Sequence, residues 1–452
     1  MKFSYICLFK MSLLQTFDEI IKNRITNMLK SIKTRLIVMN ILQWAVWGAY
    51  LTSMGSYLAS VGLATKIGLF YALQGIVSIF MPTIMGIVAD KWIPAQKLLG
   101  ICHGISGAAM TAATLYCMNA ESISFGPLFG LYFVGAAFYM PTIALSNSVA
   151  YNILENNGFD TVKTFPPIRV FGTVGFILAM LFVNFAAIDG VQFQNSEYQF
   201  LTSGILGFMM CAYCFTLPNC PCKAESTEKQ TLADRFGLKA FALFKDRQMA
   251  IFLVFSMLLG VALQITNSFA NPYIESFTGV PEFAESWGAK NANALISISQ
   301  ISETLGILLI PIAMRLFGIK KVMLIAMFAW VLRFGLFGAG DTGSGVWMLI
   351  LSMIVYGVAF DFFNISGSLY VNQRTSSSIQ NSAQGLFMLM TNGIGATIGT
   401  LSAQAVINHY VYNAANPDWS TAWYIFAGYA LVVAVLFMFL FKDPGKSASK
   451  IA

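Results

Sequence analysis

Charged side chains are scarce in this sequence. Lysine, arginine, aspartate and glutamate make up 10% of the 452 residues, whereas an ordinary soluble domain is about 25% charged. Hydrophobic residues account for 57% of the chain. The 27 basic and 20 acidic residues are too few to solvate the surface of a soluble protein of this length. The composition therefore indicates a membrane protein with several spans.

Metal ligands and nucleotide-binding motifs are also sparse. His103 and His409 are the only histidines. Cys220 and Cys222 form a lone C-x-C pair in a loop that we expect to face the reducing cytoplasm, and a metal site needs more ligands than that. The sequence has no glycine-rich loop with the spacing that cradles nucleotide phosphates. We therefore expect no metal, no cofactor, no ATP-driven pump domain and no enzymatic activity.

What the sequence does contain is a series of long apolar runs. About 20 apolar residues cross a bilayer as a helix, which satisfies its own backbone hydrogen bonds in hydrocarbon. Twelve runs are predicted to be spans, at residues 36–58, 67–89, 98–118, 125–147, 167–188, 200–217, 249–271, 292–314, 321–339, 345–368, 382–408 and 421–441. The predicted fold class is an all-α membrane protein with twelve transmembrane helices.

The longest polar interruption separates runs six and seven. It divides the chain into an N-terminal extension (1–29), a six-helix half (30–217), a cytoplasmic loop (218–248), a second six-helix half (249–441) and a cytoplasmic tail (442–452). The stretch GAAFYMPTIALSNS in helix four resembles GVAFDFFNISGSLY in helix ten, so the halves are interpreted as parallel repeats, a plan found in many secondary transporters. The extension contains no span. It is either a cytoplasmic tail or the product of a misassigned start before Met28, and we expect residues 1–27 to be dispensable.

Lysine and arginine predict the orientation. If both chain ends and the central loop are cytoplasmic, the outer loops contain only Lys66 and Lys290, and the other basic residues lie on the inner side or within spans. This asymmetry follows the positive-inside rule. The net charge of +7 therefore reflects orientation in the membrane, and we expect no nucleic-acid surface.

Polar side chains interrupt several spans of the second half. They fall on single helix faces: Gln264 and Asn267 on helix seven, Gln300 and Glu303 on helix eight, and Asp361, Asn364 and Ser368 on helix ten. A charge at mid-bilayer costs a few kcal/mol, so it is usually retained for function. The alternative is that these side chains only form hydrogen bonds that hold neighbouring helices together. Two carboxylates together with these amides favour a ligand cavity.

Amides both donate and accept hydrogen bonds, so they match hydroxyl groups and ring amides. Four aromatic residues accompany them: Phe176, Tyr356, Phe360 and Phe363. Rings and amides together suit a planar base joined to a sugar, although a plain sugar would also fit. A nucleotide is disfavoured, because Arg169 and Arg333 are the only cations in the candidate spans apart from Lys321 at the first position of the span 321–339.

The segment GIVADKWIPAQK follows helix two and resembles the G-x-x-x-D-[RK] loop of the major facilitator superfamily. This resemblance predicts a conformational latch. Gly86 would allow close helix approach, and Asp90 and Lys91 would pair with a neighbouring helix end.

Longer segments resemble the bacterial nucleoside permeases of the nucleoside:proton symporter family, within that superfamily. They are GSYLAS, MPTIMGIVADKW, FPPIRVFGTVGFI, FSMLLGVALQITNSF, SISQISETL and LSMIVYGVAFDFFNISGS. The resemblance extends from about residue 30 to about residue 441. It implies proton-coupled uptake of purine and pyrimidine nucleosides across the bacterial inner membrane by a monomer that alternates its access. A symporter of sugars or other small polar solutes, and a non-transporting receptor on the same fold, are the alternatives.

The resemblance also implies roles for individual residues. Those expected to bind the nucleoside between the halves are Arg169, Thr173, Phe176, Gln264, Asn267, Gln300, Glu303, Tyr356 and Phe360. Asp361 is the first choice for the coupling proton, and Glu303 is the second. A carboxylate removed from water holds a proton more readily, so protonation would ease closure around the ligand, and inward opening would hydrate the acid and release the proton.

Overall fold

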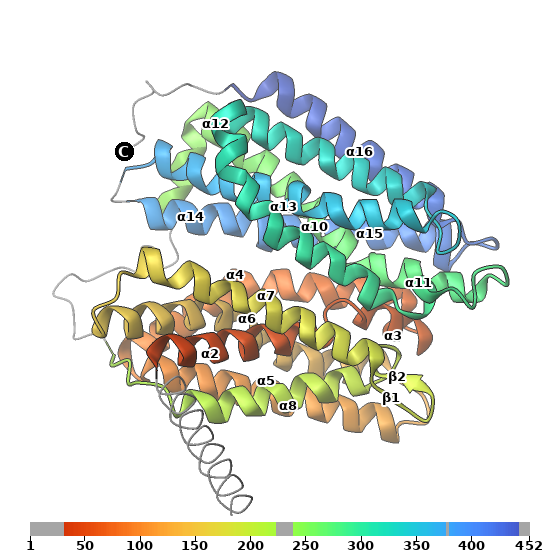
Figure 1. Cartoon of the computed structure of the whole chain (residues 1–452), viewed down its shortest axis with the longest axis horizontal. Coiled ribbons are helices and arrows are strands. Elements are labelled where there is room, and N and C mark those ends of the chain that lie inside the picture. Colours follow the sequence, from red (N-terminus) through yellow and green to blue (C-terminus); the bar gives the residue numbers. More distant parts are fainter. Residues whose placement is uncertain (1–30, 223–237, 377–378, 443–452) are drawn as a thin grey trace, which may run out of the picture.

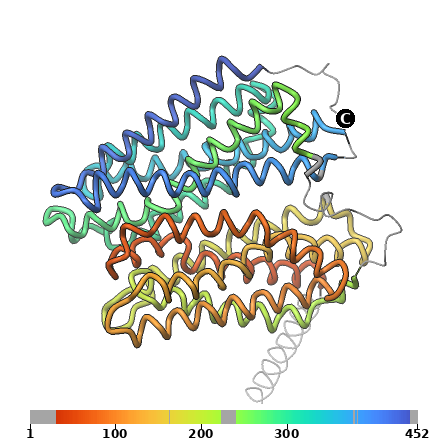
Figure 2. Tube along the Cα trace, turned by 180° about the vertical axis from the view of Figure 1, so that it is seen from behind, coloured from red at the N-terminus to blue at the C-terminus, as the bar shows by residue number. Residues whose placement is uncertain are grey.

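The computed structural model describes residues 31–222, 238–376 and 379–442. Nearly all of these residues lie in two helical bundles that lie one against the other (Figures 1 and 2). The first bundle contains the earlier part of the chain, and the second contains the later part. The expected extension at 1–29 lies outside the described residues, as do residues 223–237 of the central loop and 443–452 of the tail.

The first bundle consists of long helices with a small hairpin at one end. Its elements are α2 (Ile32–Gly48), α3 (Met54–Ser60), η1 (Ala64–Lys66), α4 (Ile67–Lys91), α5 (Ala95–Asn119), α6 (Phe125–Asn156), α7 (Thr161–Phe185), β1 (Ala187–Ile188), β2 (Val191–Gln192), η2 (Phe193–Asn195) and α8 (Tyr198–Cys214). Strands β1 and β2 pair antiparallel.

The second bundle has the longest helix of the described chain, α12. Its elements are η3 (Leu238–Lys245), α10 (Arg247–Ser276), η4 (Phe277–Gly279), α11 (Trp287–Lys290), α12 (Ala292–Ala339), α13 (Val346–Arg374), α14 (Gln380–Met388), η5 (Leu389–Gly395), α15 (Ala396–Ile407), η6 (Asn408–Tyr412) and α16 (Trp419–Leu440).

Aspartate caps fix where three of the long helices begin. The carboxylates of Asp160, Asp246 and Asp418 accept hydrogen bonds from backbone N–H groups three residues later, at 3.3, 2.8 and 2.9 Å. Each bond satisfies one of the N–H groups that the first turn of a helix leaves without a partner. The caps therefore start α7, α10 and α16 at polar residues that lie just before apolar runs.

Several predicted spans are irregular in the structure. The first is divided into α2 and α3 by turns at residues 49–53. The predicted spans 292–314 and 321–339 belong to one element, α12, which bends where Gly318 adopts φ 74° and ψ 169°. This conformation suits glycine, because an L side chain is strained at positive φ. The predicted span 382–408 contains the π-helical segment η5 between α14 and α15.

Nine helical segments among the described residues are long and apolar enough to cross a membrane. Their outward faces are apolar: Leu308, Leu316 and Phe439 are 68%, 68% and 72% exposed. Large apolar side chains in such numbers on a surface indicate contact with lipid. The composition-based prediction of a helical membrane protein is therefore confirmed, whereas the count of twelve spans is not settled by these segments alone.

Candidate functional site

Helix α10 directs a stripe of amides towards the seam between the bundles. Gln264, Asn267 and Asn271 follow one another at three- and four-residue spacing, so they share a helix face. The Asn267 Nδ2 atom donates to Gln264 Oε1 at 3.4 Å, and both side chains are half-buried. The bond is long, so the two amides retain hydrogen-bonding capacity for a ligand.

A small cavity lies beside this stripe. Three of its lining residues are predicted binding residues from three different helices, namely Asn267, Gln300 and Tyr356. The structure adds Thr52, from the turns after α2, and Arg333, from the second part of α12. The cavity therefore has walls from both bundles, and most of its polar lining comes from the second.

Two aromatic rings on α13 lead from this cavity towards a second one. Tyr356 and Phe360 are one helical turn apart, and their rings stack with centroids 5.9 Å apart and an interplanar angle of 8°. Phe360 lines a second small cavity together with Asn364 and Thr391. The stacked pair thus places flat aromatic rings beside two small cavities that each contain some polar side chains, which suits a planar ring.

Asp361 follows Phe360 directly but is buried. Its side chain is 4% exposed, and its Oδ2 atom has no hydrogen-bond partner among the described residues. A membrane-buried carboxyl without donors is held at lower cost when it is neutral than when it is charged. The environment therefore suits an acid that binds and releases a proton.

The carboxylate of Glu303 is within electrostatic range of ionisable groups in both bundles. Its carboxylate interacts with the Arg169 guanidinium of the first bundle and with Asp361 and Tyr356 of the second. No ion pair with atoms within 4 Å joins Glu303 to Arg169 in the part of the chain that the structure describes. The two side chains are therefore not held in a close salt bridge in this conformation.

Helix α7 contributes the predicted residues of the first bundle. The Arg169 guanidinium lies over the ring of Trp44, 3.8 Å from its centroid. Thr173 is half-buried, whereas Phe176 is buried edge-on against Trp47, with ring centroids 6.3 Å apart. Arg169 is thus positioned by a cation–π contact, which leaves its N–H groups able to donate. Phe176 is part of the packed core in this conformation.

The predicted latch lies at the end of α4. Asp90 is half-buried and Lys91 is exposed. A Cβ atom added to Gly86 would have no neighbour within 4 Å, so the close approach expected at Gly86 is not used in this conformation. The latch residues stay a prediction for another state of the protein.

The sequence interpretation missed a set of hydrogen bonds that join the bundles. Each connects one bundle to the other at the side opposite the C-terminal end of the described chain (Figure 1). They include Thr52 Oγ1 to Asn293 Oδ1 (2.8 Å), Ser56 Oγ to Asn271 Oδ1 (2.5 Å), Asn184 Nδ2 to Asn291 Oδ1 (2.8 Å), Gln194 Nε2 to the Lys290 carbonyl (3.1 Å) and Gly68 N–H to Gln404 Oε1 (2.5 Å).

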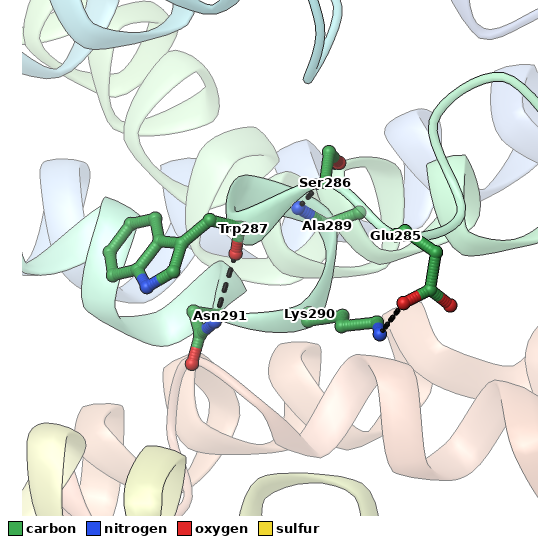
Figure 3. A network of polar contacts seen from close by, with 6 residues as sticks. All are labelled: Glu285, Ser286, Trp287, Ala289, Lys290 and Asn291. Atoms are coloured by element: carbon green, nitrogen blue, oxygen red, sulfur yellow. Dashed lines mark hydrogen bonds and ion pairs between the residues drawn. The ribbon is translucent and has the colours of Figure 1, made fainter.

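Figure 3 shows the α11 part of this seam. Ser286 caps α11 by accepting from the Ala289 N–H at 3.4 Å, and Lys290 pairs with Glu285. The Asn291 Nδ2 atom donates to the Trp287 carbonyl at 3.0 Å, and its amide oxygen points towards the first bundle. The short helix therefore presents Asn291 to Asn184 across the seam. We call these cross-bundle bonds and their residues the seam cluster.

The fold and the site together define a class of protein. Distant transporters share the arrangement: the xylose transporter XylE from Escherichia coli (13% identical, TM-score 0.58, 91% of this chain and 100% of that chain) and the peptide transporter POT (12% identical, TM-score 0.66, 90% and 93%). This is the fold of the major facilitator transporters, as the loop after helix two predicted. These two likenesses show the fold of the chain.

Closer comparisons give the family. The pattern of the family described as nucleoside H⁺ symporter matches residues 30–446, and the chain belongs to that family. The xanthosine permease of Escherichia coli is 46% identical over 423 residues, which cover 92% of this chain and 98% of that protein. The nucleoside permease NupG of the same organism is 45% identical over 416 residues, covering 91% and 96%.

Crystal structures of the nucleoside transporter NupG share 43% identity with this chain and cover 91% of it and 100% of their own chains. Their TM-scores are 0.82, and 0.85 for a variant in which one aspartate is replaced by alanine. These relatives are permeases, which confirms the prediction of a transporter rather than an enzyme.

Proposed function

We propose that this protein takes up nucleosides together with protons by alternating access. The observation that supports the proposal most directly is the buried acid Asp361, whose Oδ2 atom has no hydrogen-bond partner among the described residues, beside amides and stacked rings that suit a nucleoside. A second acid, Glu303, is within electrostatic range of Arg169. The expected roles of the other predicted residues are part of this proposal: Thr173 and Phe176 line the first-bundle side, and Gln264, Asn267 and Gln300 hold ribose or base.

The membrane arrangement belongs to the proposal as well. Counting α2 with α3 as one span, α8 as another and the two parts of α12 separately adds three spans to the nine long apolar segments, which gives twelve. We assign residues 30–217 and 249–441 to the two halves, with both chain ends on the cytoplasmic side of the bacterial inner membrane. The working unit is taken to be a monomer with purine and pyrimidine nucleosides as substrates.

In this orientation the seam cluster lies on the outer side. The hydrogen bonds of the seam cluster hold the two bundles together at that side. The conformation is therefore closed outward. A nucleoside released from the centre would leave towards the side of the chain ends.

Uptake into proteoliposomes tests this function. Labelled uridine and adenosine should accumulate inside when the outside is made more acidic, and should only equilibrate when no pH gradient is imposed. Binding without accumulation would support the receptor alternative. Accumulation of a sugar instead of nucleosides would support the sugar symporter.

The amides of α10 give a first prediction. Gln264→Ala and Asn267→Ala should each weaken nucleoside binding roughly two- to tenfold, since one net hydrogen bond contributes about 0.5–1.5 kcal/mol. Isothermal titration of uridine into the purified variants measures the effect. Asn119→Ala is the matched control, because Asn119 is an exposed amide at the end of α5 that bonds only its own helix. Wild-type affinity in both α10 variants would make these amides simple contacts between helices.

The seam cluster gives a second prediction. The Asn293 Oδ1 atom accepts from both Thr52 at 2.8 Å and Asn271 at 2.9 Å. Asn293→Ala should therefore release both donors and favour outward opening, by about 1–3 kcal/mol if they stay buried and unpaired. A Ser299→Cys reporter in the cavity should react several-fold faster with a membrane-impermeant maleimide added outside. Asn119→Ala with the same reporter provides the baseline. If the Asn293 variant reacts at that baseline rate, the bond does not hold the outer side closed.

A further inference from the structure

Arg333 is a buried cation to which the proposed function gives no role. It lies in the second part of α12, and its side chain is 2% exposed. Its Nη1 atom donates to the Ser352 carbonyl at 2.6 Å and lies 4.0 Å from the Met353 sulfur. The guanidinium carbon is 4.7 Å from the ring centroid of Tyr356 and 5.1 Å from that of Phe337. None of these neighbours carries a negative charge.

This arrangement leaves the guanidinium only partly satisfied. Arginine keeps its charge in proteins and offers five N–H donors but no acceptor. The carbonyl and the two rings compensate part of the cost of burying that charge. The Nε atom has no hydrogen-bond partner among the described residues. No acid is ion-paired with Arg333 within 4 Å in the described chain.

The side chain of this partly satisfied arginine borders a cavity. Arg333 lines the first small cavity together with Thr52, Asn267 and Gln300. The two amides add N–H donors to the same wall. The bond between Thr52 and Asn293 closes the outer side of this region. A ligand group that enters the cavity therefore meets a cation and two amides, and it is shielded from the outer solution.

We propose that this cavity is a subsite for a keto oxygen of the nucleobase, with Arg333 as the residue that determines specificity. The inference rests on the proposed function and deepens it, because it names the substrate group that is read. A guanidinium can only donate, so its partner must be an acceptor. A keto oxygen accepts two such bonds, whereas an amino group in the same place presents hydrogens and leaves a buried charged N–H unpaired. Sites that leave buried polar groups unpaired discriminate strongly.

Inosine and adenosine form a matched pair for the test, because they differ at the 6-position, which is a keto oxygen in inosine and an amino group in adenosine. The purified wild-type protein should bind inosine at least about tenfold more tightly than adenosine, as expected when a hydrogen bond to a charged group is gained or lost. In Arg333→Met, which keeps a long apolar side chain without donors, that preference should fall to about twofold or less. Titration calorimetry measures both affinities.

Arg333 also contacts Tyr356, so the variant can lower the affinity for all nucleosides by displacing the Tyr356 ring. An equal loss for both ligands, with the preference unchanged, would make Arg333 a positioning residue only and would overturn the subsite. If Arg333→Met does not fold, the wild type decides with purine riboside, which lacks any 6-substituent: it should bind about as weakly as adenosine, and binding equal to inosine overturns the subsite. If the wild type binds no nucleoside, the proposed function itself fails, and the subsite fails with it.

Discussion

Asp361→Asn should abolish pH-driven accumulation while leaving nucleoside binding largely intact. Asparagine keeps the size of the side chain and its hydrogen-bonding ability but cannot ionise. Asp361 is 4% exposed, and its Oδ2 atom has no partner, so no salt bridge is lost with the charge. The variant imitates the protonated acid permanently. It can still exchange nucleoside down a gradient, but it has no proton to release inside.

The measurement compares accumulation with exchange in the same proteoliposomes. A gradient of about one pH unit corresponds to about 1.4 kcal/mol, so one coupled proton can support roughly tenfold accumulation. The wild type should approach this ratio, whereas Asp361→Asn should stay near equal concentrations inside and outside. Exchange of labelled for unlabelled uridine should persist in both proteins.

Glu303→Gln is the control for this assignment. Glu303 interacts with Arg169 across the seam and with Asp361 on its own side, so we expect its loss to lower affinity more than coupling. Because the two acids interact, their titrations are shared, and each variant changes the behaviour of the other acid. Full pH-driven accumulation by Asp361→Asn would move the proton site to Glu303.

The polar stripe on the tenth predicted span, which is helix α13 in the structure, shows how far the sequence predicts the site. Spacing placed Asp361, Asn364 and Ser368 on one face, but the structure gives them different surroundings. Asp361 is buried, Asn364 lines the second cavity, and Ser368 donates to Gln384 Oε1 at 3.1 Å. Helical periodicity shows which side chains share a face of the helix. It does not show which neighbouring helix each of those side chains packs against along the length of that face. One face of a long helix can therefore pass several environments.

Arg333 and the seam cluster show what periodicity could not supply. In the sequence, Arg333 is one cation in an apolar run, and its contact with Tyr356 exists because α12 bends at Gly318 and its second part then packs along α13. Nothing in the sequence distinguishes amides that form hydrogen bonds across the two bundles, such as Asn184, Asn271 and Asn293, from amides that form them within one bundle. Burial of Arg333 in a predicted span was the available clue, since such charges are usually functional.

The predicted spans succeeded for a physical reason that also limits them. Apolar length follows from the thickness of the bilayer, so the runs locate most helices well. The charged stretch at 315–321 marks where a chain leaves hydrocarbon, and it was interpreted as a gap between helices. The break between the helices is present, because the two helical parts of α12 meet within this stretch at Gly318, whose φ and ψ are not helical. No loop separates the two parts, so the gap is a kink.

The last prediction concerns Gly357, where helices α12 and α13 are in close backbone contact. A Cβ atom there would lie 2.2 Å from the Ser302 carbonyl oxygen of α12, and the neighbouring Gly306 is equally constrained by the Gly357 carbonyl at 2.9 Å. These glycines let α13 pack directly on α12, which holds Tyr356 beside Gln300 at the cavity. Gly357→Ala must push the helices apart, because the obstacle is backbone rather than a flexible side chain.

We expect Gly357→Ala to destabilise the protein by about 1–3 kcal/mol or more, the range found when well-packed contacts are overfilled. Nucleoside affinity should fall in the same variant, since the residues of the cavity are displaced relative to one another. Thermal unfolding in detergent and titration with uridine measure the two effects. Gly428→Ala is the matched control: Gly428 is exposed on α16 and a Cβ atom there meets nothing within 4 Å. Alanine suits a helix better than glycine by up to about 1 kcal/mol, so the control should be as stable as the wild type or more so. Normal stability and affinity in Gly357→Ala would show that the two helices separate without cost, and that the cavity does not depend on their close contact.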